Sequence, residues 1–281
     1  MSGVYIFGAG QKGVEVLNEL KSEGVNIIGF LENDPLKHNK KVEGICILGD
    51  ASYLKDNEFS KVIIASILGY RIMIEQLKRV GVTADKIETK FVEYHVRARE
   101  QFLIDYAKIW RDVPGDVAEG GVFQGEFAKQ INIEFPNDPL YLFDTFTGFD
   151  ERDLATEYKN SYSKGKKDDF HFTNISLVMD KMINPQNVII KKGYFPETTL
   201  GLEGNSYKFV NLDFDLYEPI LAGIKYFYPR MIPGSVILIH DYFSEGYKGV
   251  KRAVDKFNEI EPNLLIMPIG DNYSISIVKS Y

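Results

Sequence analysis

The chain has 281 residues, a formal net charge of −7 and 44% hydrophobic residues, which is typical of a globular protein long enough for two domains. The acidic balance disfavours a nucleic-acid partner, and no apolar run approaches the roughly 18–20 residues of a membrane-spanning helix. The single cysteine, Cys46, excludes an internal disulfide and fits a reducing compartment, so we expect a cytoplasmic protein with no membrane association.

The first predicted elements are a strand, a glycine turn and a helix. Val4 to Phe7 form an apolar strand, and the following segment has an apolar helical face. The glycines between them have the spacing GxGxxG, in which the first allows a tight turn, the second lets the backbone approach a phosphate and the third lets the helix pack on the strand. The candidate cofactor-binding glycines are Gly8, Gly10 and Gly13.

A second apolar strand ends in Glu32, about twenty residues after the turn, where an acid can hold a ribose hydroxyl. With a third strand at 61–66, residues 1–88 are predicted to form a small Rossmann-like nucleotide-binding domain. In the alternative interpretation, the glycines only close a strand–helix turn and Glu32 ends its strand in solvent.

The segment GFLENDPLKHNKKVEGICILG resembles the nucleotide-binding N-terminal domain of bacterial sugar-modifying enzymes, notably nucleotide-sugar acyltransferases. The resemblance covers residues 1 to about 85. No Tyr-x-x-x-Lys pair follows, so residues 1 to about 85 lack the acid–base pair that would assist hydride transfer. We interpret it as a binding or scaffolding module.

Residues 89–112 are predicted to form a connecting helix that ends before Val113-Pro114-Gly115. Its charged residues include His95, Arg97 and Arg99. We expect these side chains on a solvated helix face, with contact to a ligand as the alternative.

Residues 113–281 alternate strands with helices and end in two strands around a Gly-Asp-Asn turn, which predicts an antiparallel hairpin. This order is similar to the seven-stranded sheet of class I methyltransferases, so the predicted fold class is α/β with two Rossmann-like domains. The strand segments are DVAE, PLYLFD, NVIIKKGYF, KFVNLDFD, SVILIHD and the two halves of LLIMPIGDNYSISIVK.

Carboxylates close two of these strands. Asp213 and Asp215 are two residues apart and therefore face the same side of a strand, and Asp241 follows the next strand. Because ligands of parallel sheets bind at the carboxyl ends of the strands, the three could form an oxygen-rich site for magnesium. His240 either binds metal or acts as a base, or it is a hydrogen-bonded histidine at the strand end.

Five motifs together resemble the macrocin O-methyltransferase family, sugar-directed enzymes that depend on S-adenosylmethionine and magnesium: AEGGVFQG, FDTFTGF, KKGYFPETT, LDFDLYEP and HDYFSEGYKGVKRAVDKF. The resemblance covers residues 113–281. It implies that a glycine loop wraps the methionine end of the cofactor, that Asp144 holds the ribose, and that Asp213, Asp215 and Asp241 bind Mg²⁺ or another divalent cation. The implied loop residues are Glu119, Gly120, Gly121 and Gly125.

One departure concerns His240, which stands where many members of the family have aspartate. Imidazole is a poorer magnesium ligand than a carboxylate. The polar segment 150–173 resembles a lid, and His171 lies near the place of the family's catalytic histidine, with a solvated or packing role as the alternative. The candidate catalytic residues are His171, His240 and Asp213.

The expected function is metal-dependent O-methyl transfer from S-adenosylmethionine to a sugar or a sugar-bearing metabolite such as a nucleotide sugar. The enzyme alternative is an NAD(P)-dependent sugar oxidoreductase acting through Gly8 to Glu32, and the non-catalytic alternative is a nucleotide-sugar binding protein. The partner is expected to be a small molecule, and the resemblance favours a homo-oligomer.

Overall fold

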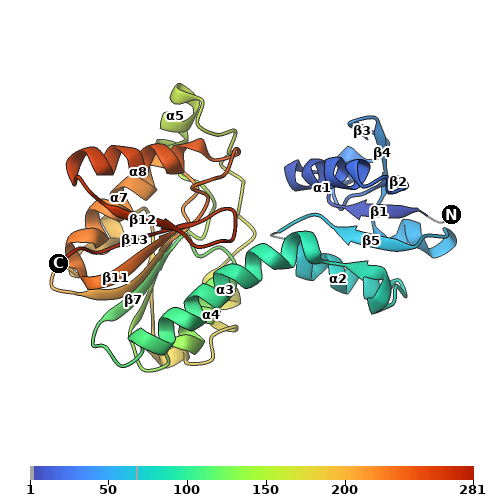
Figure 1. Cartoon of the computed structure of the whole chain (residues 1–281). Helices are drawn as coiled ribbons and strands as arrows, with labels where there is room; N and C mark the ends of the chain where they lie inside the picture. Colours follow the sequence, from blue (N-terminus) through green and yellow to red (C-terminus); the bar gives the residue numbers. More distant parts are fainter. Residues whose placement is uncertain (1–2, 68) are drawn as a thin grey trace. The chain divides into compact units, whose positions relative to one another are not determined.

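The computed structural model describes residues 3–67 and 69–281, which divide into two compact units, each with a sheet of its own (Figure 1). One unit ends at Arg97 and the other spans Ala98–Tyr281, so the division falls inside helix α3 (Lys90–Trp110). The domain bounds predicted at 88 and 113 stay a prediction. No helix in the described part of the chain has the length and apolar character needed to cross a membrane.

The first unit has a six-stranded sheet in the order β3-β4-β2-β1-β5-β6. Its central strands pair in parallel, and only β3 is antiparallel to its neighbour. The buried strand residues form cores on both faces of the sheet because each face is covered. The bounds are β1 Val4–Phe7, α1 Gln11–Ser22, β2 Ile27–Leu31, β3 Lys41–Val42, β4 Ile45–Gly49, β5 Lys61–Ile64, α2 Tyr70–Arg79 and β6 Ile87–Glu88.

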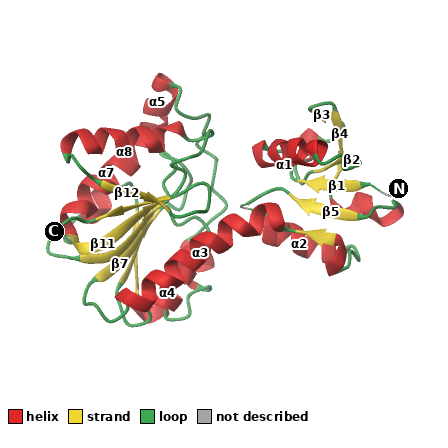
Figure 2. Ribbon diagram, in the orientation of Figure 1, coloured by secondary structure: helices red, strands yellow, loops and turns green. Residues whose placement is uncertain are grey.

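The second unit has a seven-stranded sheet in the order β12-β13-β11-β10-β7-β8-β9, with β13 antiparallel to both of its neighbours. Figure 2 shows this sheet with helices along its sides. The bounds are β7 Asp116–Gly120, α4 Glu126–Glu134, β8 Leu140–Asp144, α5 Glu151–Asn160, α6 Ile175–Met179, β9 Val188–Lys192, β10 Tyr207–Leu212, α7 Tyr217–Phe227, β11 Met231–Ile239, α8 Lys248–Ile260, β12 Leu265–Pro268 and β13 Ile275–Val278.

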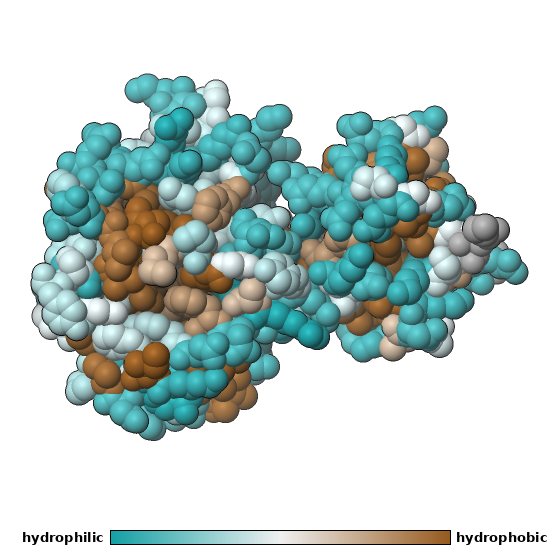
Figure 3. Space-filling view, in the orientation of Figure 1, coloured by the Kyte–Doolittle hydropathy of each residue, from teal (hydrophilic) through white to brown (hydrophobic). Residues whose placement is uncertain are grey.

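The two faces of this sheet bury separate cores. Helices α7 and α8 contribute to one core, and α3, α4 and α6 contribute to the other. Every residue of β10 is buried because both faces of the sheet are covered. The buried residues include Lys208 and Asn211, whose polar groups are hydrogen-bonded within the protein. The edge strand β12 is different, because Leu265 and Met267 are about half exposed, and hydrophobic surface lies over this edge in Figure 3.

The predicted fold class is confirmed: the chain is α/β with two sheets, one of them seven-stranded and closed by the predicted antiparallel hairpin. The strands before Asp213 and His240 are parallel neighbours, with Leu212 opposite Ile239. Helix α5 occupies the first part of the segment 150–173, whose role as a lid stays a prediction.

Helix α5 buries two carboxylates. Glu157 is fully buried, and one of its oxygens accepts a hydrogen bond of 2.9 Å from the backbone N–H of Tyr217, the first residue of α7. Residue Leu216, which precedes α7, has no side chain able to cap the helix. The Glu157 carboxylate therefore takes the place of an N-cap and offsets the positive end of the helix dipole.

Replacing Glu157 with alanine should lower the free energy of unfolding by about 1–3 kcal/mol, because the buried N–H of Tyr217 loses its acceptor. Glu157→Gln, which keeps an acceptor oxygen, should lose less. Urea denaturation measures both, with Glu151→Ala on the exposed side of the same helix as the control. Equal losses for Glu157→Ala and Glu151→Ala would contradict the capping role.

Asp153 provides a pH-dependent prediction. Burial raises its pKa to about 6 from 3.8, although Tyr194 donates a hydrogen bond of 2.8 Å to the carboxyl. Since the folded protein favours the protonated form, the stabilisation is present below pH 3.8 and is lost as the pH rises through 6. Asp153→Asn should therefore gain stability relative to the unaltered protein, by up to about 3 kcal/mol between pH 4 and pH 8. A difference that does not change with pH in urea titrations would refute this.

Candidate functional site

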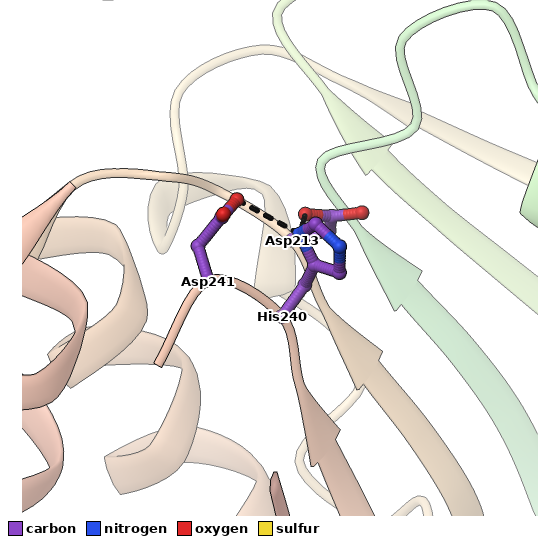
Figure 4. Close-up of side chains that lie close together, drawn as sticks. All are labelled: Asp213, His240 and Asp241. Carbon is purple, nitrogen blue, oxygen red and sulfur yellow. Dashed lines mark hydrogen bonds and ion pairs between the residues drawn. The ribbon is translucent and has the colours of Figure 1, made fainter. Parts of the chain in front are cut away.

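The carboxyl ends of β10 and β11 bring Asp213, His240 and Asp241 together (Figure 4). Nδ1 of His240 lies 3.0 Å from Oδ1 of Asp213 and 2.8 Å from Oδ2 of Asp241. One possible ligand atom of each residue lies within 4.8 Å of the others, so the three could hold a metal ion. Asp215, predicted as a ligand, lies outside this cluster but contacts Asp241, and its assignment stays a prediction.

The backbone at both strand ends is turned out of the extended conformation. Asp215 and Asp241 have φ angles of 63° and 59°, in the left-handed region, which few residues other than glycine, asparagine and aspartate adopt. In a continued strand, His240 and Asp241 would point to opposite faces. The turn at Asp241 lets both side chains face Asp213, and such strained residues are common at functional sites.

The charges in this cluster depend on one another. Burial alone would raise the pKa of Asp213, but His240 and Arg99 hold it well below its usual range. Burial would lower the pKa of His240, yet Asp213 and Asp241 raise it to about 10. Burial and the adjacent Asp241 raise the pKa of Asp215. Without a cation, the cluster therefore favours an imidazolium between two carboxylates, and burial beside Asp241 favours the protonated form of Asp215.

Arg99 corrects one expectation from the sequence, because its side chain is not on a solvated helix face. It is only 12% exposed, and Nη2 donates hydrogen bonds of 2.9 Å to both Asp213 and Asn211. The guanidinium also lies 4.1 Å above the ring of Phe127. Arg97, two residues earlier, is 74% exposed as expected. His95 is 8% exposed and therefore also departs from the solvated face.

Asn211 continues the network to the end of β7. Its amide donates a hydrogen bond of 2.9 Å to Oε1 of Glu119, the residue opposite it in the sheet. Glu119 is 2% exposed, and its Oε2 has no hydrogen-bond partner among the described residues. Burial raises the pKa of Glu119 well above its usual value. A buried carboxyl oxygen without a partner costs free energy that a ligand donor could recover.

The glycine loop after β7 lies directly against the end of β10. The backbone N–H of Asp213 donates a hydrogen bond of 2.7 Å to the carbonyl of Gly120. Gly121 has a φ angle of 79°, and a Cβ there would lie 2.0 Å from the carbonyl oxygen of Asp213. Only glycine fits at this position. Gly125, also with a φ of 79°, precedes the first residue of α4.

Asp144 closes β8 as predicted, but its carboxylate already serves the glycine loop. Oδ2 accepts hydrogen bonds from the backbone N–H groups of Val122 and Phe123, and Oδ1 accepts one from Phe146. A carboxylate oxygen can accept two hydrogen bonds, so Oδ1 keeps capacity for a ligand hydroxyl. Sequence spacing could place Asp144 at the strand end but could not show these bonds.

The other predicted residues lie elsewhere. His171 is exposed, and its ring contacts the carbonyl of Asp168 and the ring of Phe172. In the first unit, Glu32 accepts hydrogen bonds from the backbone of Ala9, Asn33 and Asp34 and from Lys37. Gly8 has a φ of 113°, and a Cβ on Gly13 would overlap the Gly8 carbonyl. These glycines therefore shape the turn, and their role in cofactor binding stays a prediction.

Comparisons with known proteins agree with this architecture. The family model Macrocin-O-methyltransferase (TylF) matches residues 101–268, and the model C2185-like, N-terminal, matches residues 1–88. Among solved structures, the calicheamicin methyltransferase CalS11 has a TM-score of 0.56 and 16% identity, covering 81% of this chain and 89% of that one. The O-methyltransferase NovP has a TM-score of 0.52 and 19% identity, covering 66% and 80%. At such identities these structures show the fold alone. None of the curated proteins matches the sequence.

The buried position of Arg99 leads to a stability prediction. Arg99→Ala should lower the free energy of unfolding by about 3 kcal/mol, because Asp213 would stay buried without its guanidinium partner. Arg99→Lys should lower the free energy of unfolding by less, since lysine keeps the positive charge but lacks the planar guanidinium. Arg97→Ala is a matched control on the same helix and should change stability by less than about 0.5 kcal/mol. Similar denaturation midpoints for Arg99→Ala and Arg97→Ala would disprove the role of Arg99.

Proposed function

The chain belongs to the macrocin O-methyltransferase family, since the family model matches more than half of it, and from this premise we propose its reaction and its site. It transfers a methyl group from S-adenosylmethionine to a hydroxyl of a sugar or nucleotide sugar, with the aid of a divalent cation. Among the similar structures, CalS11 and NovP carry names that describe methyltransferases. The sugar as acceptor follows from the family resemblance.

One observation carries the proposal: the glycine loop after β7 and the carboxylates after β10 lie side by side at the carboxyl ends of two neighbouring strands. The hydrogen bond from Asp213 N–H to Gly120 O joins the end of β10 to the loop after β7. A cofactor bound by that loop would lie next to a substrate held at Asp213. Methyl transfer is an in-line displacement, so this adjacency supplies the positioning that the reaction needs.

Three features of the site could hold the cofactor. Glu119 offers an unpartnered buried oxygen to the ammonium group of the methionine moiety, and Asp144 keeps acceptor capacity for a ribose hydroxyl. No side chain caps the start of α4, so this helix N-terminus can face the cofactor carboxylate. These three features lie at the carboxyl ends of neighbouring strands, where ligands of such sheets bind.

The carboxylates fit a cation and a base. Asp213 and Asp241 offer oxygens to the metal, with His240 between them. A divalent cation there would supply Lewis acidity that lowers the pKa of a bound hydroxyl. Asp215 is the candidate base, because it contacts Asp241 beside the cation site, and a bound cation would favour the ionised carboxylate that can take up a proton from the acceptor. His171 is less suited, since it is exposed and its ring contacts Asp168 and Phe172 of its own loop.

The alternatives explain less of the site. An NAD(P)-dependent oxidoreductase would need Glu32 for the ribose, but four donors already occupy its carboxylate. A non-catalytic binding protein would not need buried acids in the second unit, which are costly without ligands. The nucleotide-binding role of the first unit stays a prediction.

Calorimetric titration tests the proposal with the full-length chain. S-adenosylmethionine should bind with micromolar-range affinity, and Asp144→Ala should weaken binding at least tenfold, about 1.4 kcal/mol, by loosening the glycine loop and removing the ribose acceptor. Asp255→Ala, on the exposed side of α8, is the control and should bind normally.

Turnover is measured with methyl-labelled S-adenosylmethionine and a panel of sugars and nucleotide sugars. Asp241→Asn should abolish methyl transfer while leaving cofactor binding intact, because it removes a cation ligand but no part of the glycine loop. No cofactor binding in any condition would reject the methyltransferase proposal, and full activity of Asp241→Asn would reject the role of the cation.

A further inference from the structure

We propose that the cation site takes a first-row transition metal, such as Mn²⁺, Co²⁺ or Zn²⁺, in preference to Mg²⁺, because His240 provides a nitrogen ligand. The inference rests on the proposed function, since it concerns the cation of the same site. It goes further because it identifies the class of metal from a residue of this chain. The resemblance alone would imply magnesium.

The first step is the composition of the donor set. The cluster offers one carboxylate oxygen each from Asp213 and Asp241 and one ring nitrogen from His240. In Figure 4 dashed lines join the imidazole to both carboxylates. With distances of 3.0 Å and 2.8 Å, Nδ1 faces the same small volume as both acids.

The second step is that the strand end determines the direction of His240. The backbone N–H of His240 continues the sheet by donating to the carbonyl of Leu212, which holds the residue beside Asp213. The left-handed turn at Asp241 then brings the next carboxylate to the same side. The ring of Tyr273 stacks on the imidazole at 6.0 Å and 19° and restricts its orientation. His240 is therefore built into the site and is not a strand-end histidine pointing into the fold.

The third step is ligand preference. Magnesium demands oxygen ligands in near-ideal octahedral geometry and gives up its waters reluctantly. Imidazole nitrogen suits zinc, iron and nickel, and affinity for mixed nitrogen and oxygen sites rises from Mn²⁺ through Co²⁺ to Ni²⁺. A third carboxylate would leave an oxygen-only site, so the nitrogen of His240 is the donor that changes the preference.

The test compares metals on the full-length protein after removal of bound metal with a chelator. Calorimetric titrations with MgCl₂, MnCl₂ and CoCl₂ should give dissociation constants for Mn²⁺ and Co²⁺ at least about tenfold below that for Mg²⁺. His240→Asp restores an oxygen-only donor set and should reduce this ratio at least about tenfold, mainly by weakening Co²⁺. His171→Asp, at an exposed histidine outside the cluster, should leave the ratio unchanged.

Spectroscopy provides a readout that does not depend on activity. Mn²⁺ bound to the unaltered protein should show magnetic coupling to a ¹⁴N nucleus, and the coupling should disappear in His240→Asp. Tighter binding of Mg²⁺ than of Mn²⁺, or a metal preference that His240→Asp leaves unchanged, would overturn the inference. Binding of no cation at all would overturn it as well.

Titration of S-adenosylmethionine on the same samples separates the two proposals. If the cofactor binds and its methyl group is transferred while Mg²⁺ remains the preferred metal, only the inference about His240 fails. If Mn²⁺ binds with nitrogen coupling but the cofactor does not bind, the methyltransferase proposal fails and the transition-metal site stands.

Discussion

The parallel pairing of β10 with β7 on one side and β11 on the other is the constraint on which the site depends. It places Glu119 opposite Asn211 and Leu212 opposite Ile239, so three chain segments far apart in sequence end at one edge. Because β10 is buried over its whole length, packing on both faces fixes its register. The acids at its end are thus positioned by the core and not by loops.

Two cations built into the protein make this concentration of acids tolerable. Nη2 of Arg99 donates hydrogen bonds to both Asp213 and Asn211. The His240 ring contacts both Asp213 and Asp241. Buried carboxylates require such partners. The guanidinium comes from α3, so this helix contributes to the site as well as to the core beneath the sheet.

The sequence predicted the features that depend on local pattern. Continuous apolar runs ending in Asp144, Asp213 and His240 gave the strands, their parallel class and the edge at which the acids meet. It could not predict the role of Arg99, because an arginine in a helix has the same local pattern whether its side chain is solvated or buried. Nor could spacing show that Asp241 adopts a left-handed turn, which brings its carboxylate to the same side as His240.

The close approach of Gly121 to Asp213 has a consequence for dissecting the site by mutation. A side chain at position 121 would collide with the backbone that carries Asp213, so the glycine loop and the acid cluster cannot move independently. A substitution meant to perturb cofactor contacts through this loop also displaces the neighbouring acid. The two subsites can therefore be separated experimentally only through side chains that reach into one of them.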